Sequence, residues 1–341
     1  LFWTAAGLEL NVRGSELWVE FTADWDIHEP WYSFMVNGEF FSRRMAQKGT
    51  ERVCVFRGMD PEKVKNVRIF KDTQAMNADP ESVLQINAVE TDGEFLPVPE
   101  RNLKIEFIGD SITSGEGDIG AKAETDWISM FFSAENNYAV MVSRALNADI
   151  RVSSQSGWGV CCGWNNDPNS AIPPIYRQLC GLLSGEKNIA LGAKEPYDFT
   201  KWQPNYVFIN LGTNDCGAFS QPAWTDETTG ETFQNRRTED GKLNPEDEAR
   251  FAHGATAFLK QLRGYYPNAR LVWIYGMLGL ELAPALQKAI DDYKAETGDA
   301  NAEFLSLTDD LKNRGCRDHP GVGAHRTAAN ELIAYIKKRN A

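Results

Sequence analysis

The first hundred residues carry short runs in which apolar and polar positions alternate, the period of half-buried β-strands. Such runs cover residues 8–12, 17–22, 32–36, 52–56, 67–70 and 83–89. The dipeptides Asn37-Gly38 and Asp92-Gly93 follow two of these runs, and both favour the positive φ of a two-residue hairpin turn. Several short antiparallel strands of this kind predict an all-β sandwich or jelly roll.

The pattern changes after Leu96-Pro97-Val98-Pro99, because proline donates no hydrogen bond to a sheet and stiffens the chain. Continuous apolar runs then alternate with helical patterns. The apolar runs cover residues 103–108, 150–152, 206–211, 271–275 and 304–307, and the helical patterns cover residues 138–146, 246–265, 282–296 and 327–338. This alternation predicts an α/β domain whose parallel sheet lies between two layers of helices. We therefore expect a β-sandwich domain over residues 1–98 and a three-layer α/β/α domain over residues 99–341.

Length and charge narrow the class of protein. The chain has 341 residues, which fits two domains at roughly 150 residues each. Its 35 basic and 48 acidic residues give a net charge of −13, which disfavours nucleic acid and anionic membranes as partners. No apolar stretch approaches the ~18 residues of a membrane-spanning helix. The chain starts at Leu1 with neither a recognisable signal peptide nor an initiator Met, so a secreted and a cytoplasmic location both stay open.

Six cysteines are too few for a disulfide scaffold, and none of them forms a CxxC pair of the kind that binds zinc. Cys161 and Cys162 are adjacent, and a disulfide between neighbours is strained. We interpret both as small buried residues. A bridge from one of them to Cys180 or Cys216 is the alternative.

Ligands of an open parallel sheet bind at the carboxyl ends of its strands, so the residues after each apolar run are candidates for chemistry. The first run leads into Gly109-Asp110-Ser111, a tight turn that presents a serine hydroxyl to a cleft. The second leads into Ser156-Gly157, and the third into Gly212-Thr213-Asn214-Asp215. His319-Pro320 lies between the last run and the last helix.

These four motifs, in this order and at these places, resemble the SGNH or GDSL-type serine hydrolases over residues 100–341. With a β-sandwich in front, the whole chain resembles carbohydrate esterase family two. The members of that family are acetyl esterases that act on xylan and related plant polysaccharides. The resemblance thus implies an SGNH-hydrolase fold for the second domain, a serine esterase activity, and an acetylated oligosaccharide or polysaccharide as partner.

Deacylation of an ester needs a nucleophile, a base and donors for the oxyanion. We expect Ser111 to attack the acetyl carbonyl and His319 to act as base, since an imidazole can exchange protons at neutral pH. The backbone N–H groups of Ser111 and Gly157 and the side-chain amide of Asn214 are expected to form the oxyanion hole. No metal or other cofactor is needed in this scheme. The other histidines are interpreted as surface or capping residues: His28, His253 and His325.

One position departs from the pattern of the family. Most SGNH hydrolases carry an Asp three positions before the histidine, and this chain has Cys316 there. Asp318 adjoins His319, but successive residues of an extended loop point apart, so Asp318 is not expected to orient the ring. Family two esterases often replace the acid by a backbone carbonyl. We therefore expect a Ser111–His319 dyad, with an acid from elsewhere in the chain as the alternative.

Two tryptophans, Trp158 and Trp164, bracket the glycine loop. Tryptophan supplies either core volume or a flat platform for sugar rings. Family two esterases have an aromatic residue a few positions beyond the oxyanion glycine, and it packs over the substrate. We expect Trp164 above all, together with Trp158, to contact the substrate.

Two other classes of function stay open. A lipase or thioesterase of the same superfamily would need a wide apolar cleft, which the polar and aromatic loops disfavour. A carbohydrate-binding protein with a degenerate hydrolase domain is the other alternative, and the intact set of Ser111, Asn214 and His319 argues against it. The sequence assigns no oligomeric state, and a homo-oligomer is compatible with it.

Overall fold

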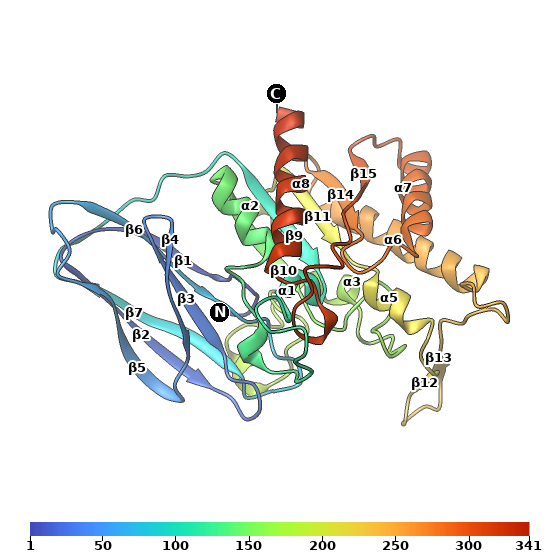
Figure 1. The fold of residues 1–341 in the computed structure, drawn as a ribbon, viewed down its shortest axis with the longest axis horizontal. Coiled ribbons are helices and arrows are strands. Elements are labelled where there is room, and N and C mark those ends of the chain that lie inside the picture. The colour runs from blue at the N-terminus through green and yellow to red at the C-terminus, as the bar shows by residue number, and fades with distance from the viewer. Residues whose placement is uncertain (341) are drawn as a thin grey trace.

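The computed structural model describes residues 1–340, and its first part is a sandwich of two antiparallel sheets (Figure 1). One sheet has the order β4-β3-β6-β1-β8 and the other the order β5-β2-β7. The strands are β1 (Gly7–Arg13), β2 (Glu16–Asp24), β3 (Trp31–Val36), β4 (Glu39–Met45), β5 (Gly49–Arg57), β6 (Val64–Lys71), β7 (Val83–Thr91) and β8 (Glu94–Leu96). Alternate residues of β2 are buried, as the sequence pattern predicts, and they meet the other sheet in the stacked ring pair of Phe21 and Tyr32.

Of the two predicted hairpins, one is confirmed and one is wrong. Asn37 and Gly38 have positive φ and join β3 to β4 by a two-residue turn, because Val36 pairs with Glu39. Gly93 instead connects strands of different sheets, since β7 pairs with β2 and β8 pairs with β1. A Cβ atom on Gly93 would lie 1.9 Å from the carbonyl oxygen of Arg13. Glycine is therefore needed at this position for close backbone approach rather than for a hairpin.

The second part is built on a parallel sheet with the order β10-β9-β11-β14-β15. Its strands are β9 (Lys104–Gly109), β10 (Asp149–Ser154), β11 (Tyr206–Asn210), β14 (Arg270–Tyr275) and β15 (Ala302–Ser306). One face is covered by α2 (Tyr138–Leu146) and α8 (Val322–Asn340), and the other by α6 (Pro245–Tyr265) and α7 (Ala283–Thr297). The predicted parallel sheet between two helical layers is confirmed (Figure 1).

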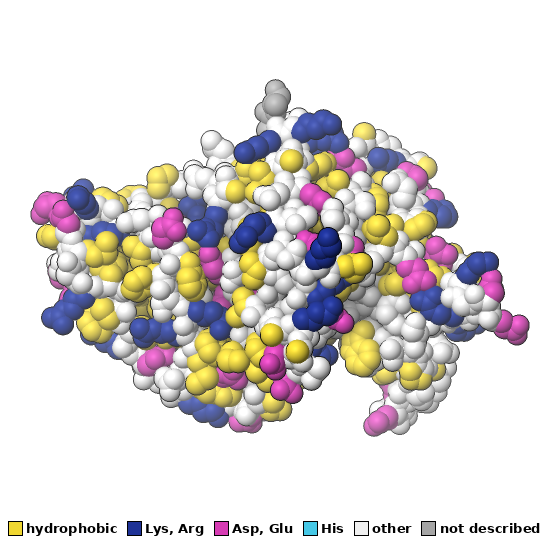
Figure 2. Space-filling model, in the orientation of Figure 1, with side chains coloured by type: hydrophobic (Ala, Val, Ile, Leu, Met, Phe, Trp, Pro, Cys, Tyr) yellow, Lys and Arg dark blue, Asp and Glu magenta, His cyan; other side chains and the backbone are white. Residues whose placement is uncertain are grey.

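Short elements fill the loops between these strands and helices. They are α1 (Ser111–Ser114), η1 (Ser129–Phe131), α3 (Ile172–Ile175), α4 (Glu186–Ala190), η2 (Phe199–Lys201), α5 (Thr213–Ala218), β12 (Trp224–Thr225), β13 (Thr232–Phe233) and η3 (Cys316–Asp318). The β12–β13 hairpin projects from the body of the protein, and the face drawn in Figure 2 is hollowed beside this projection. Over residues 1–340, the helices are too short or too polar to cross a membrane.

The connection between the two parts runs from Leu96 at the end of β8 to Lys104 at the start of β9. The boundary between residues 98 and 99 lies within this connection and stays a prediction. The two parts also contact each other through a segment that is distant in sequence from this connection. Residues 72–79, which follow β6, are largely buried against the α/β part, where Ala75 packs in the same core cluster as Val207 and Ile209 of β11.

Candidate active site

Ser111 stands at the carboxyl end of β9, where a tight turn leads into α1. The side chain of Asp110 caps this turn by accepting a hydrogen bond from the N–H of Ile112 at 3.0 Å. Burial raises the pKa of Asp110 to about 8. A Cβ atom on Gly109 would lie 2.0 Å from Oγ1 of Thr113, so only glycine permits the turn to fold so closely. The turn thereby fixes the serine at the rim of the sheet.

His319 reaches Ser111 from the loop after β15, and its Nε2 lies 2.9 Å from the serine Oγ. Its other ring nitrogen, Nδ1, lies 3.3 Å from the carbonyl oxygen of Arg317. Arg317 and Asp318 both have left-handed backbone conformations, with φ of 55° and 58°. Non-glycine residues rarely adopt this conformation, and two in succession turn the loop back so that a carbonyl faces the ring. The structure thus brings the predicted nucleophile and base together.

The acidic side chains near His319 do not occupy the position of a triad acid. Asp318 has a side chain that is 74% exposed and pairs with Lys122 at 3.3 Å. Cys316 is buried and directs its Sγ toward the carbonyl oxygen of Glu124, 3.4 Å away. A triad acid accepts a hydrogen bond from Nδ1, and here that nitrogen faces a backbone carbonyl. This geometry fits the expected dyad.

Glu116 is a neighbour of the histidine that sequence reasoning missed. Its buried carboxylate lies 3.6 Å from Nε2 of His319 and 3.5 Å from Nε of Arg317. It therefore lies on the serine side of the ring, not on the Nδ1 side. The only signal in the sequence is an acidic residue five positions after Ser111, in the loop that leaves the same short helix.

The loop of residues 155–162 follows β10 and carries Gly157, which has φ +80°. Seven amide N–H groups of this loop donate to partners among the described residues, and the N–H of Gly157 does not. The acceptors are the carbonyl oxygens of Gly109, Gln155 and Ser170, the side chain of Gln74 and the carboxylate of Asp215. A free amide within an otherwise fully bonded loop is the pattern required of an oxyanion donor.

Asp215 anchors the far end of this loop. Its buried carboxylate accepts hydrogen bonds from the N–H groups of Val160 and Cys161 at 2.8 Å and of Cys162 at 3.4 Å. Burial raises the pKa of Asp215 to about 6 even though these hydrogen bonds favour the ionised form. A Cβ atom on Gly159 would lie 2.3 Å from the carboxylate, so the loop wraps closely around Asp215.

Asn214 is the second residue of α5, which starts shortly after the end of β11, and its side chain contacts the same loop. Its Nδ2 donates to the carbonyl oxygen of Trp158 at 2.8 Å. An amide nitrogen carries two hydrogens, so one N–H of Asn214 remains for another acceptor. The structure thereby brings the side chain of Asn214 to the residue that follows Gly157. The predicted assignment of Ser111, Gly157 and Asn214 to an oxyanion hole is compatible with this geometry and stays a prediction.

The two predicted substrate tryptophans differ in exposure. Trp164 is 53% exposed, and its backbone N–H donates to the carbonyl oxygen of Gly157 at 3.0 Å. A Cβ atom on Gly157 would lie 3.1 Å from the indole ring of Trp164. Trp158 is 9% exposed and packs within the core cluster of the α/β domain. Trp164 is thus the exposed indole beside Gly157, while Trp158 packs in the core.

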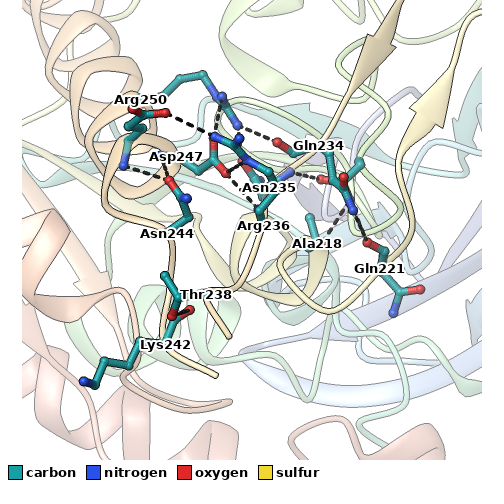
Figure 3. Close-up of polar contacts among 12 residues, drawn as sticks. Ala218, Gln221, Gln234, Asn235, Arg236, Thr238, Lys242, Asn244, Asp247 and Arg250 are labelled. Carbon is teal, nitrogen blue, oxygen red and sulfur yellow. Dashed lines mark hydrogen bonds and ion pairs between the residues drawn. The ribbon is translucent and has the colours of Figure 1, made fainter. Parts of the chain in front are cut away.

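The loop that carries Trp164 is braced against the projecting hairpin. Nδ2 of the buried Asn166 donates to the carbonyl oxygens of Ala218 at 2.9 Å and Pro222 at 3.0 Å, and its Oδ1 accepts from the N–H of Asn235 at 2.8 Å. The bonding continues to α6, where Asp247 pairs with Arg236 and Arg250 at 2.8 Å each (Figure 3). The segments that lead into and out of the hairpin are therefore both tied to the body of the protein.

The six cysteines are all free in the structure. The alternative bridge to Cys180 or Cys216 is therefore not formed, and the interpretation of Cys162 as a small buried residue holds. Cys161 is only partly buried, and burial raises the pKa of the Cys162 thiol, which disfavours its reactive thiolate form.

Comparison with protein families places the chain in a class. Residues 107–329 match the GDSL-like Lipase/Acylhydrolase family, and the chain belongs to this family. Among solved structures, it is similar to an acetyl xylan esterase from the rumen bacterium Butyrivibrio proteoclasticus, with 44% identity and a TM-score of 0.97 over 99% of this chain and 90% of that one. A family two carbohydrate esterase from Clostridium thermocellum, solved with cellohexaose, has the same fold, with 24% identity and a TM-score of 0.79 over 99% of this chain and 93% of that one.

Curated relatives match with lower identity. The chain is 25% identical to the cellulase/esterase CelE of Acetivibrio thermocellus over 99% of its own length, and 24% identical to an acetylxylan esterase / glucomannan deacetylase of Cellvibrio japonicus over 72% of its length. It spans 37% and 61% of the length of these two relatives.

Proposed function

We propose that the protein is a serine esterase that removes acetyl groups from xylan or related plant polysaccharides and oligosaccharides. The observation that carries the proposal is the 2.9 Å contact between Nε2 of His319 and Oγ of Ser111. Beside it, the N–H of Gly157 is the one amide of the 155–162 loop without a partner among residues 1–340. The names of its relatives, acetyl xylan esterase and acetylxylan esterase / glucomannan deacetylase, support acetylated polysaccharide as the substrate class.

In this mechanism, Ser111 attacks the acetyl carbonyl carbon while His319 takes the hydroxyl proton on Nε2. Negative charge develops on the carbonyl oxygen, and N–H donors of Ser111, Gly157 and Asn214 stabilise it. The intermediate collapses with cleavage of the ester bond, and His319 returns the proton to the departing sugar hydroxyl. Water then attacks the acetyl-serine with His319 again as base, which releases acetate and restores the free serine.

The positive charge that His319 gains in each step is stabilised by neighbouring oxygen atoms. The carbonyl of Arg317 faces the protonated Nδ1 at 3.3 Å, which fixes the tautomer that leaves Nε2 free to accept from Ser111. The carboxylate of Glu116 lies 3.6 Å from Nε2. A backbone carbonyl and a nearby carboxylate thus supply the electrostatic support that a triad obtains from its acid.

Acetate release from acetylated xylo-oligosaccharides tests the proposal, with Ser111→Ala as the control for background hydrolysis. We expect wild-type protein to release acetate and to prefer p-nitrophenyl acetate over p-nitrophenyl esters of long acyl chains. Absence of acetate release by the wild type would refute the esterase and favour the carbohydrate-binding alternative. A preference for long acyl chains would favour the lipase or thioesterase alternative.

Trp164→Ala is expected to lower kcat/KM on acetylated xylo-oligosaccharides by roughly three- to tenfold, the value of one aromatic stacking contact of about 0.5 to 1.5 kcal/mol. The loss on p-nitrophenyl acetate should be smaller, because that substrate has no sugar ring to stack. Trp224→Ala, which removes an indole from the projecting hairpin, is the matched control. Equal losses on both substrates would contradict a platform role for Trp164.

A further inference from the structure

The segment of residues 72–79 links the β-sandwich to the loop that carries Gly157. Its residues Asp72, Gln74 and Ala75 are fully buried, and Ala75 packs in the core of the α/β domain. The segment follows β6 directly, so it belongs to the sandwich by chain connectivity and to the active-site wall by packing. A residue on this segment can therefore act on the site across the domain interface.

Gln74 contacts the residue that precedes Gly157 in the active-site loop. Its Oε1 accepts hydrogen bonds from the backbone N–H of Ser156 at 2.8 Å and from the Ser156 hydroxyl at 2.9 Å. A carbonyl oxygen has two lone pairs, so these two bonds use its full acceptor capacity. Its Nε2 has no partner among the described residues. Both hydrogen bonds of the side chain therefore go to Ser156, the residue immediately before the oxyanion glycine.

Hydrogen bonds anchor the segment both before and after Gln74, so the backbone that carries this side chain is fixed in place. Upstream, the carboxylate of Asp72 accepts from the N–H of Ala134 at 2.9 Å and pairs with Arg43. Downstream, Asp79 accepts from the N–H groups of Ile27 and His28 at 2.7 and 2.8 Å. The sandwich thus presents the Gln74 side chain from a rigid support.

Gly157 has particular need of such a support. It has no side chain to pack, and its φ of +80° belongs to a region that glycine enters freely but does not hold by itself. The Gly157 N–H belongs to the peptide unit that joins Ser156 to Gly157, so the backbone conformation of Ser156 determines where this N–H points. The two hydrogen bonds from Ser156 to Gln74 restrain that residue and thereby the direction of the free amide.

We propose that Gln74 is a positioning residue for the oxyanion hole, supplied by the β-sandwich to the hydrolase domain. This inference rests on the proposed esterase function. It gives the sandwich a role in catalysis that is distinct from binding polysaccharide. The role acts through Ser156 on Gly157, so it concerns the rate of the chemical step and not substrate affinity.

The test compares Gln74→Leu, which removes the acceptor at similar volume, with Gln74→Glu, which keeps an acceptor oxygen. On p-nitrophenyl acetate, Gln74→Leu is expected to lower kcat about 10- to 100-fold, the effect of displacing a catalytic group by about 1 Å, while KM changes less than about twofold. Gln74→Glu is expected to restore kcat to within about threefold of wild type, because a carboxylate oxygen accepts both bonds. If Gln74→Leu does not fold, Gln74→Asn replaces it in the test. Its side chain is one methylene shorter, so its amide oxygen no longer reaches Ser156, and we expect the same loss of kcat.

Asn77→Ala is the matched control. Asn77 lies on the same segment and accepts from the side chain of Gln155 at 2.9 Å, so its loss removes a neighbouring interdomain bond without freeing the Ser156 amide. We expect its kcat to stay within about twofold of wild type. A folded Gln74→Leu with wild-type kcat, or a Gln74→Glu as slow as Gln74→Leu, would overturn the inference while the wild type remains an active esterase. A wild type without activity on acetyl esters would instead refute the proposed function.

Discussion

Replacing His319 with alanine is expected to lower kcat on p-nitrophenyl acetate about 10³-fold or more, whereas Asp318→Asn should retain kcat within about twofold. His319 is the proposed base and lies within hydrogen-bonding distance of Ser111, so its loss would leave the serine hydroxyl without an acceptor for its proton. Asp318 instead pairs with Lys122 at the surface. Asparagine is the right replacement there because it tolerates the left-handed φ of 58° that alanine disfavours.

This comparison decides between a dyad and a triad. If Asp318→Asn loses as much activity as His319→Ala, the acid takes part in the reaction and the carbonyl of Arg317 does not replace it. Thermal unfolding of both variants is the control for folding. A Tm within a few degrees of wild type would show that a loss of kcat reflects chemistry.

Asn214→Ala is expected to lower kcat about 10²- to 10³-fold, which corresponds to about 2.7 to 4 kcal/mol of lost transition-state stabilisation. The amide would donate to the oxyanion more strongly than to the ground-state carbonyl, so KM should change much less than kcat. Steady-state kinetics on p-nitrophenyl acetate give both parameters. Acetylated xylo-oligosaccharides should show the same fold-change, because the acetyl carbonyl is common to both substrates.

The hydrogen bond from Asn214 to the carbonyl of Trp158 makes a structural effect the competing explanation. Removing the donor leaves that carbonyl unsatisfied and costs about 1 to 3 kcal/mol of stability if it stays dry. The free energy of unfolding therefore has to be measured beside kcat. Asn165→Ala, which removes an amide from the neighbouring Trp164 loop, is the control. A drop in stability with kcat within tenfold of wild type would contradict the oxyanion role.

Much of the fold could be predicted because burial leaves a regular trace in the sequence. The five apolar runs after Pro99 correspond to the five strands of the parallel sheet, since such strands are covered on both faces. The alternation in β2 likewise follows from burial of one face. The turn dipeptides were less informative, because Asp92-Gly93 reports a local backbone preference while the sheet that each strand joins is decided by tertiary packing.

The sequence motifs predicted that Ser111 and His319 lie together, and their side chains are 2.9 Å apart in the structure; their roles as nucleophile and base stay predictions. Contacts made by backbone atoms, or by side chains far away in the sequence, could not be predicted. The carbonyl of Arg317 faces the imidazole because of two unusual φ angles, which no residue type at these positions announces. Gln74 reaches Ser156 across 82 positions in the sequence, through docking of one domain on the other. Trp158 is buried because its side chain points into the core rather than into solvent, and its position in a loop does not predict that direction.

The surroundings of Cys316 bear on whether an acidic side chain fits at this position. The thiol lies 3.4 and 3.6 Å from the carbonyl oxygens of Glu124 and Asp126, to which an S–H group can donate weakly. An aspartate introduced here would place a carboxylate against the same two carbonyl oxygens, which are acceptors and cannot donate to it. Position 316 is therefore unfavourable for the aspartate that most SGNH hydrolases carry three positions before the histidine, because the thiol donates weakly to these carbonyls and an ionised carboxylate cannot donate.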